Sequence, residues 1–235
     1  MTEQEEKEKR RGEFVTACLD RLGINQDYAT QHDAEIEAQE VKEAAARKQD
    51  RYEKTAPRRY WRESLETYNT TTQKQVQALA IVRRFVTATK AGKAVGLALL
   101  GAVGTGKTHL ACGALKEIGG KFYNASELGE RMHRAHGFST KETEYEILDE
   151  CTDCDLLVID EIGRGANSED EKYAIYKILN ERYNAEKSTL LISNLSRVDF
   201  FNYIGAAAAD RFSEVGGVFE FGNEKSYRKE LRGEK

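Results

Sequence analysis

A glycine-rich segment at residues 101–108 has the residue types and spacing of a phosphate-binding loop. Its sequence, GAVGTGKT, fits the pattern G-x-x-x-x-G-K-[ST]. Glycines let backbone N–H groups turn inward around an anion without clashes from side chains. The ammonium of Lys107 can reach the β- and γ-phosphates, and the Thr108 hydroxyl can ligate Mg²⁺. The residues expected to contact ATP are Gly101, Ala102, Val103, Gly104, Thr105, Gly106, Lys107, Thr108 and His109.

Two acidic residues follow a continuous apolar run later in the chain. Residues 156–159 lead directly into Asp160 and Glu161, which is the arrangement of a Walker B motif. We expect Asp160 to hold Mg²⁺, directly or through water, and Glu161 to polarise the attacking water as general base. The alternative is a solvated turn, but the phosphate-binding loop in the same chain favours the functional interpretation. Because the second carboxylate is placed to activate water, the pair favours nucleotide hydrolysis over transfer to a small acceptor.

The elements around these residues must bring them together. A short apolar run at residues 95–100 precedes the loop as a strand and a helix follows it, a context that a chance glycine-rich turn would lack. Another strand is expected at residues 189–192, and Asn194 behind it could orient the attacking water by hydrogen bonding. Ligands of parallel sheets lie at the carboxyl ends of strands. The loop, Asp160 and Asn194 all fall there.

Strands and helices alternate in the second half of the chain, which predicts a parallel sheet with right-handed crossovers. The expected fold class is α/β, a three-layer αβα core around a five-stranded parallel sheet. Thr72 and Gln75 resemble a capping box at the start of a helix. One helix is expected at residues 198–211, before a last strand at 218–221. The strand at residues 156–161 should be central and covered on both faces.

Residues 25–55 are rich in strong helix formers and almost lack an apolar stripe. Such a helix is either a solvated spacer or an arm that binds a partner. Pro57, the only proline, marks a boundary together with the Arg-Arg-Tyr-Trp sequence that follows it. We expect a helical partner-binding arm at residues 1–56, a linker and leading helix at 57–92, and the ATPase core at 93–235.

Length and composition limit the number of domains and the classes of partner that the chain can have. At 235 residues the chain suits one domain with an appendage. The net charge of −4 is mild, so local basic clusters must carry any binding to nucleic acid. The four cysteines do not form a secreted-type framework, and no apolar run is long enough to cross a membrane. We therefore expect a soluble cytoplasmic protein that does not associate with membranes.

The series GAVGTGKTHL, DLLVIDEIG, LLISN, ADRF and SYR resembles the AAA+ ATPases of the DnaC-type replicative helicase loaders. The IstB-type transposition helpers are close relatives of that family. The resemblance spans roughly residues 57–228 and implies an AAA+ P-loop NTPase fold without a C-terminal helical lid. It implies that Asn194 is a sensor 1 residue, that Arg211 is an arginine finger for a neighbouring subunit, and that Arg228 is a sensor-2-like arginine. A guanidinium at such a site can neutralise charge that develops on the γ-phosphoryl group.

The resemblance also implies a function and partners. The protein would load a hexameric, DnaB-like replicative helicase through its N-terminal arm, assemble into an ATP-dependent spiral, and hydrolyse ATP slowly until DNA and the partner stimulate it. Two alternatives remain: an IstB-like ATPase helper of DNA transposition, and a nucleotide-binding scaffold without turnover, against which Glu161 argues. In the resembled loaders, the elements between the phosphate-binding loop and Walker B contact single-stranded DNA. In this stretch the candidate DNA contacts are Arg131, Arg134, Phe138 and Lys141, since a basic groove with an aromatic residue suits binding that tolerates any sequence. The alternative for each of them is a solvated helix face.

Two histidines and two cysteines have ligand types that are typical of zinc sites. His133 and His136 precede Cys151 and Cys154 in the chain. Both pairs fall on expected core elements, and Cys154 lies directly before a strand predicted to be buried. The resembled family has no metal at these positions. A zinc site is therefore the less favoured interpretation.

Overall fold

The structure is a computed structural model that describes residue 6, residue 9 and residues 26–137, 142–165 and 169–222. The chain divides into two units, residues 1–48 and 49–235. Helix α2 (Gln26–Thr55) confirms the long helix expected near the N-terminus. In the first unit two apolar side chains of this helix are solvated, since Ile36 is 47% exposed and Val41 63% exposed. No helix in the described ranges is long and apolar enough to cross a bilayer.

The division into units falls between residues 48 and 49, within α2. The reason is packing within the second unit. Tyr52 and Ala56 are buried in its hydrophobic core, and the Tyr52 hydroxyl donates a hydrogen bond to the carbonyl of Tyr60 at 2.7 Å. The last turns of α2 therefore fold with the second unit.

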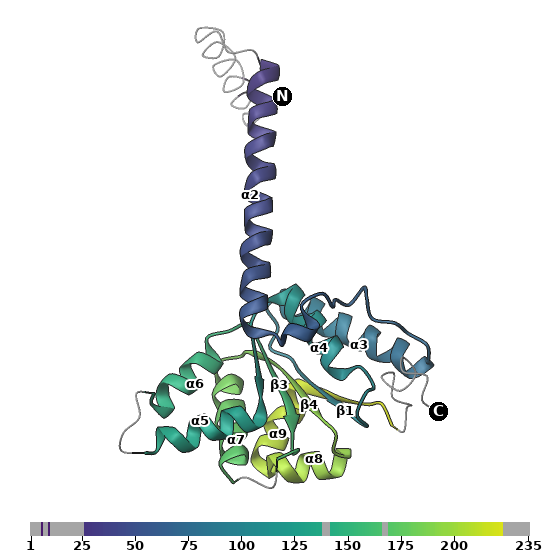
Figure 1. Ribbon diagram of the computed structural model, residues 1–235, viewed down its shortest axis with the longest axis vertical. Helices are drawn as coiled ribbons and strands as arrows, with labels where there is room; N and C mark the ends of the chain where they lie inside the picture. The colour runs from purple at the N-terminus through teal and green to yellow at the C-terminus, as the bar shows by residue number, and fades with distance from the viewer. Residues whose placement is uncertain (1–5, 7–8, 10–25, 138–141, 166–168, 223–235) are drawn as a thin grey trace. The chain divides into compact units, whose positions relative to one another are not determined.

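The second unit contains a five-stranded parallel sheet with the strand order β2-β3-β4-β1-β5 (Figure 1). This confirms the predicted α/β fold class. The strand that carries the Walker B motif is central, with a parallel neighbour on each side. Both of its faces are covered as expected, since Val158 lies in one hydrophobic cluster and Leu157 in the other. The strands are β1 (Gly96–Leu100), β2 (Lys121–Asn124), β3 (Leu156–Ile162), β4 (Ser188–Ser193) and β5 (Gly216–Glu220).

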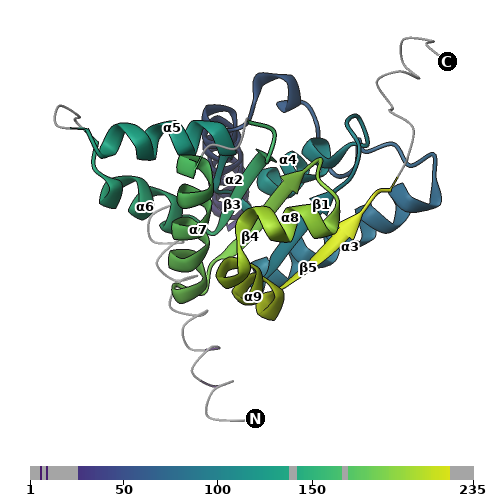
Figure 2. The same ribbon diagram turned by 90° about the horizontal axis from the view of Figure 1, so that it is seen from below.

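Helices cover both faces of the sheet (Figures 1 and 2). In β1, Leu97 and Leu99 face one hydrophobic cluster, whereas Ala98 and Leu100 face the other. This two-sided burial explains why the strands are continuously apolar instead of alternating. On the first face lie α3 (Gln73–Lys90) and α4 (Lys107–Ile118). On the second lie α5 (Ala125–Ala135), α6 (Glu144–Thr152), α7 (Glu169–Asn184), α8 (Arg197–Ile204) and α9 (Ala206–Val215).

Local signals at helix ends gave one correct and one wrong prediction. Thr72 and Gln75 form the expected capping box at the start of α3. The single helix predicted at residues 198–211 is wrong, because Gly205 separates α8 from α9 with a φ of 82°. Glycine adopts this left-handed conformation without a steric penalty. The break starts a new helix that buries Phe212 against β1, so closely that a Cβ on Gly96 would lie 2.8 Å from its ring.

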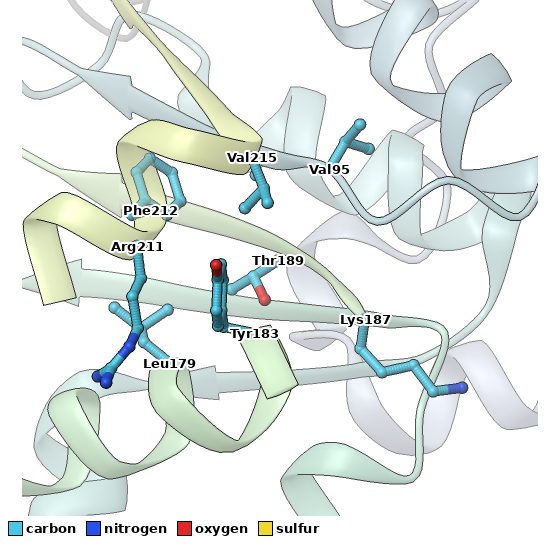
Figure 3. A pocket seen from close by; sticks show the side chains of 9 residues that line it. Val95, Leu179, Tyr183, Lys187, Thr189, Arg211, Phe212 and Val215 are labelled. Atoms are coloured by element: carbon cyan, nitrogen blue, oxygen red, sulfur yellow. The ribbon is translucent and has the colours of Figure 1, made fainter. Parts of the chain in front are cut away.

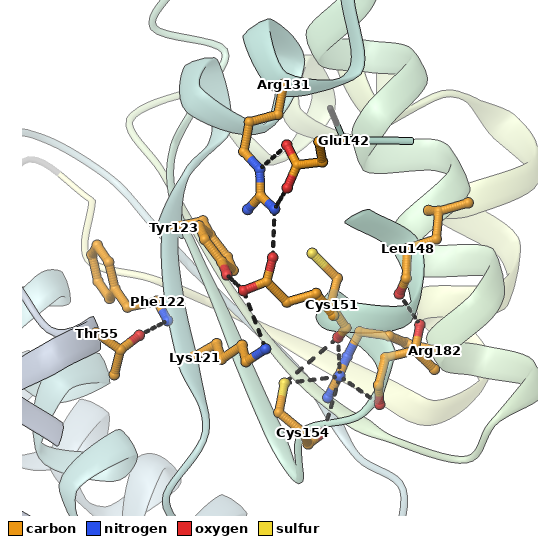
Figure 4. Close-up of polar contacts among 12 residues, drawn as sticks. Thr55, Lys121, Phe122, Tyr123, Arg131, Glu142, Leu148, Cys151, Cys154 and Arg182 are labelled. Atoms are coloured by element: carbon orange, nitrogen blue, oxygen red, sulfur yellow. Dashed lines mark hydrogen bonds and ion pairs between the residues drawn. The ribbon is translucent and has the colours of Figure 1, made fainter. Parts of the chain in front are cut away.

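A buried arginine joins α7 to the ends of α6 and β4 (Figure 4). Arg182 is 1% exposed and donates hydrogen bonds to the carbonyls of Cys151 at 2.6 Å and Cys154 at 3.0 Å. It also donates to the Thr189 hydroxyl at 2.9 Å and to the Ser188 carbonyl. Its planar fork thus satisfies several backbone acceptors at once.

Candidate nucleotide site

The glycine-rich loop connects β1 to α4 and packs against the segment that precedes α3. The hydroxyl of Tyr68 donates a hydrogen bond to the carbonyl of Thr105 at 3.2 Å. Gly106 has a φ of 92°, and a Cβ there would lie 2.6 Å from the Tyr68 ring. Only glycine fits both the backbone conformation and this close approach. The tight packing explains the glycine at this position of the loop.

Lys107 begins α4, and its ammonium lies within the loop. It is 5% exposed and donates hydrogen bonds to the carbonyls of Gly101 at 2.7 Å and Ala102 at 2.8 Å. These contacts hold a buried positive charge beside backbone that is expected to bind phosphate. The helix N-terminus adds partial positive charge at the same place.

Thr108 and Asp160 come from different elements but form one polar pair. The Thr108 hydroxyl donates to Asp160 Oδ2 at 2.8 Å, and the other carboxylate oxygen accepts the N–H of Glu161 at 2.7 Å. Burial raises the pKa of Asp160, and these hydrogen bonds only partly oppose the effect. A hydroxyl beside a desolvated carboxylate is a donor set that suits Mg²⁺, whose charge would favour the ionised carboxylate.

The Walker B residues occupy an irregularity in the sheet. The pairing of β3 with β4 shifts between Ile159 and Ile162, so Asp160 and Glu161 lie in a bulge. Glu161 has a φ of 61°, which is uncommon for a residue with a side chain. Its carboxylate forms an ion pair with Arg164. Arg164 belongs to no motif, so the sequence does not mark it as a site residue.

One pocket gathers residues from several separated segments. Loop residues 103–109, Asp160, Glu161 and Asn194 all line it, as expected for the carboxyl edge of the sheet. Asn194 is exposed just after β4. The lining residues that sequence analysis did not assign to the site are Arg59, Tyr60, Glu63, Arg164 and Ile192. The first three follow Pro57, where the sequence suggested only a boundary.

His109 also lines this pocket, but its ring contacts the segment before α3. Its Nε2 lies 2.9 Å from the carbonyl oxygen of Ser64 and 3.4 Å from a carboxylate oxygen of Glu63. The ring packs edge-on against Tyr68 at 5.2 Å between centroids. His109 therefore fixes the preceding segment against α4.

Arg211 does not line the nucleotide pocket of its own chain. It lies on α9, where its side chain runs alongside Leu179 and away from Val95 (Figure 3). Its Nη1 atom is buried and has no hydrogen-bond partner among the described residues. Arg228, the other predicted arginine, lies outside the described residues.

Comparison with known proteins decides the family. Residues 25–234 match the model for the IstB-like ATP binding protein family. The chain belongs to this family. It is similar to the replicative helicase loader DnaC of Escherichia coli strain K12, at 28% identity over 174 residues that cover 72% of this chain and 71% of the relative. DnaC of Buchnera aphidicola subsp. Schizaphis graminum is 32% identical over 139 residues, covering 57% and 56% of the two chains.

A solved structure gives the same result as the sequences. The crystal structure of the DnaC helicase loader matches with a TM-score of 0.62 and 28% identity, covering 70% of this chain and 99% of that one. The predicted resemblance to DnaC-type loaders and the AAA+ P-loop fold are thus confirmed. Membership of an ATP-binding family implies a nucleotide ligand.

The predicted DNA contacts of this IstB-like protein have different surroundings. Arg131 is held by Glu142 at 2.6 Å and by Glu150, with its side chain only 12% exposed and its guanidinium over the Tyr123 ring (Figure 4). Burial alone would raise the pKa of Glu150, but hydrogen bonds from Arg131 and Tyr123 outweigh it and lower the pKa to about 2. In this structure the Arg131 guanidinium is therefore paired with carboxylates of its own chain.

Of the three other predicted DNA contacts, only Arg134 lies within the described residues. Arg134 is exposed and lines a separate pocket beside α7. Phe138 and Lys141 lie outside the described residues. Among the predicted DNA contacts that the structure describes, Arg134 has the solvent-exposed side chain.

The four residues considered for zinc do not come together. His133 and His136 pair with carboxylates of Asp170 and Glu144 on the protein surface. Cys151 and Cys154 are buried beside Arg182, and burial raises the pKa of both thiols. Within the described ranges, no group of three or more potential metal ligands is found. These positions do not fit a zinc site.

Proposed function

We propose that this protein is an ATP-hydrolysing loader of a hexameric, DnaB-like replicative helicase that contacts single-stranded DNA during the initiation of DNA replication. The main support is the single pocket that gathers the phosphate-binding loop, both Walker B acids and Asn194. The similarity to DnaC supports the helicase as partner. ATP and Mg²⁺ are the proposed substrate and cofactor.

Each site residue has a proposed role in hydrolysis. Lys107 and the backbone N–H groups of the loop bind the phosphates. Thr108 and Asp160 would hold Mg²⁺, which when bound offsets phosphate charge. Glu161, once released from Arg164, accepts a proton from the attacking water, which the Asn194 amide orients.

A neighbouring subunit would complete the site. Arg211 lies away from the pocket of its own chain and has an unpaired buried nitrogen among the described residues. It would therefore supply its guanidinium to an adjacent protomer in an ATP-dependent spiral. Arg228 would contribute a sensor-2-like charge.

The Arg211→Ala variant is expected to reduce ATP turnover roughly tenfold or more while keeping ATP affinity within about threefold. Mixing it with Lys107→Ala should restore part of the turnover, because one chain then supplies an intact loop and the other an intact Arg211. Phosphate release measures both effects, and Arg197→Ala, at an exposed position of α8, is the control. No recovery on mixing would contradict a contribution from the neighbouring subunit.

Purified replicative helicase on a solid support should capture the full chain, and more strongly with ATP. The solvated apolar residues of the arm provide a specific test. Replacing Ile36 and Val41 together with aspartate should reduce capture about tenfold or more, because apolar contacts would be lost, without changing ATP affinity. The matched control replaces Glu40 and Glu43 with glutamine.

Three results separate the candidate functions. Capture by the helicase that depends on Ile36 and Val41 supports the loader. Binding to a transposase and duplex DNA but not to the helicase would favour an IstB-like transposition helper. Absence of turnover in the wild-type protein with helicase and DNA present would favour a nucleotide-binding scaffold.

A further inference from the structure

A buried carboxylate outside the motifs holds the turn that follows Glu161. Glu171 lies in the first turn of α7 and is 1% exposed. Its Oε1 accepts the N–H of Gly163 at 3.0 Å and the hydroxyl of Tyr203 at 2.7 Å. Gly163 is two residues beyond Glu161, and Tyr203 belongs to α8. A single oxygen atom therefore links the end of β3 to two helices.

The turn requires support because its backbone conformation is unfavourable. Glu161 has a φ of 61°, and such conformations persist only where the surroundings fix them. From β4, the Ser193 hydroxyl donates to the carbonyl of Ile162 at 2.6 Å. Glu171 holds the next residue from α7. The two hydrogen bonds fix the turn from two separate elements, β4 and α7.

The acceptor itself has little freedom to move. A Cβ on Gly129 of α5 would lie 2.9 Å from the Cα of Glu171, so the two helices pack in backbone contact. Burial and the hydrogen bond to Glu171 raise the pKa of Tyr203 well above its usual value. The phenol therefore stays protonated and remains a donor at ordinary pH. The Glu171 carboxylate is thus held in place and can position the turn at Gly163.

We propose that Glu171 is a positioning residue for ATP hydrolysis, which orients Glu161 by holding the N–H of Gly163 and the hydroxyl of Tyr203. This inference rests on the proposed ATPase function. Tyr203 lies on the helix that follows Asn194, so the same carboxylate connects the turn of the general base to the segment after the water-orienting amide. Small displacements of a general base lower the rate of the chemical step more than they weaken substrate binding.

Two substitutions at one position separate positioning from core packing. Glu171→Met keeps the length of the side chain but removes the acceptor, and it should lower kcat roughly tenfold with the Kd for ATP kept within about twofold. Glu171→Gln keeps an oxygen acceptor and should retain kcat within about threefold. Glu169→Gln, an exposed carboxylate in the same helical turn, should match the wild type.

Phosphate release and titration with a fluorescent ATP analogue give kcat and Kd. A wild-type kcat in Glu171→Met would overturn the inference, as would equal losses in kcat and ATP affinity. If Glu171→Met does not fold, Tyr203→Phe provides the test: kcat should fall about threefold at unchanged Kd, and an unchanged kcat overturns the inference. Lack of turnover in the wild-type protein would instead overturn the proposed function, on which the inference depends.

Discussion

Replacing Glu161 with glutamine is expected to reduce ATP turnover about a hundredfold or more while ATP affinity changes less than about threefold. The amide keeps the size of the side chain but cannot accept a proton from water. The backbone strain at this position is the same for both residues, so the local fold should be kept. Steady-state phosphate release, with single-stranded DNA and helicase present, and nucleotide titration measure the two quantities.

Two variants serve as controls for this experiment. Lys107→Ala removes the ammonium held within the loop and should abolish ATP binding itself. Glu186→Gln alters the other described non-glycine residue with positive φ, at 52°, which is exposed and away from the pocket, and it should behave as wild type. If neither Glu161→Gln nor Arg211→Ala lowers the rate, the proposed site is wrong.

Replacing Arg182 with methionine is expected to lower the free energy of unfolding by about 3 kcal/mol. The substitution removes the guanidinium donor from buried carbonyls of Cys151, Cys154 and Ser188. Burial lowers the pKa of Arg182, so removing the charge recovers some desolvation cost. The loss of these hydrogen bonds should nevertheless outweigh this gain, because one guanidinium donates to several acceptors.

Urea unfolding followed by circular dichroism measures the change. Lys187→Met, at a partly exposed neighbour that pairs with Asp155 at 3.4 Å, should alter the free energy of unfolding by less than about 0.5 kcal/mol. Arg182→Lys should still destabilise the protein, since an ammonium lacks the planar fork. Wild-type stability in Arg182→Met would mean that desolvation of the guanidinium matches the value of its hydrogen bonds.

Several contacts of the site and its surroundings join distant parts of the chain. Arg131, which stays a predicted DNA contact, pairs with Glu142 and Glu150 on later segments. Arg164 and Glu171 had no motif to identify them, although both contact the Walker B turn or its carboxylate. The exact packing partners of such residues cannot be inferred from local spacing.

The sequence by itself determined the phosphate-binding loop, the Walker B pair, the α/β fold class and the capping box at Thr72, because these depend on residues close together in the chain and on the period of the apolar pattern. Tertiary structure alone decided the break at Gly205, the ion pair of Glu161 with Arg164, and the buried positions of Glu171 and Arg182. The physical reason is that burial and hydrogen bonding at these positions depend on which distant elements pack together, and packing is a property of the whole fold.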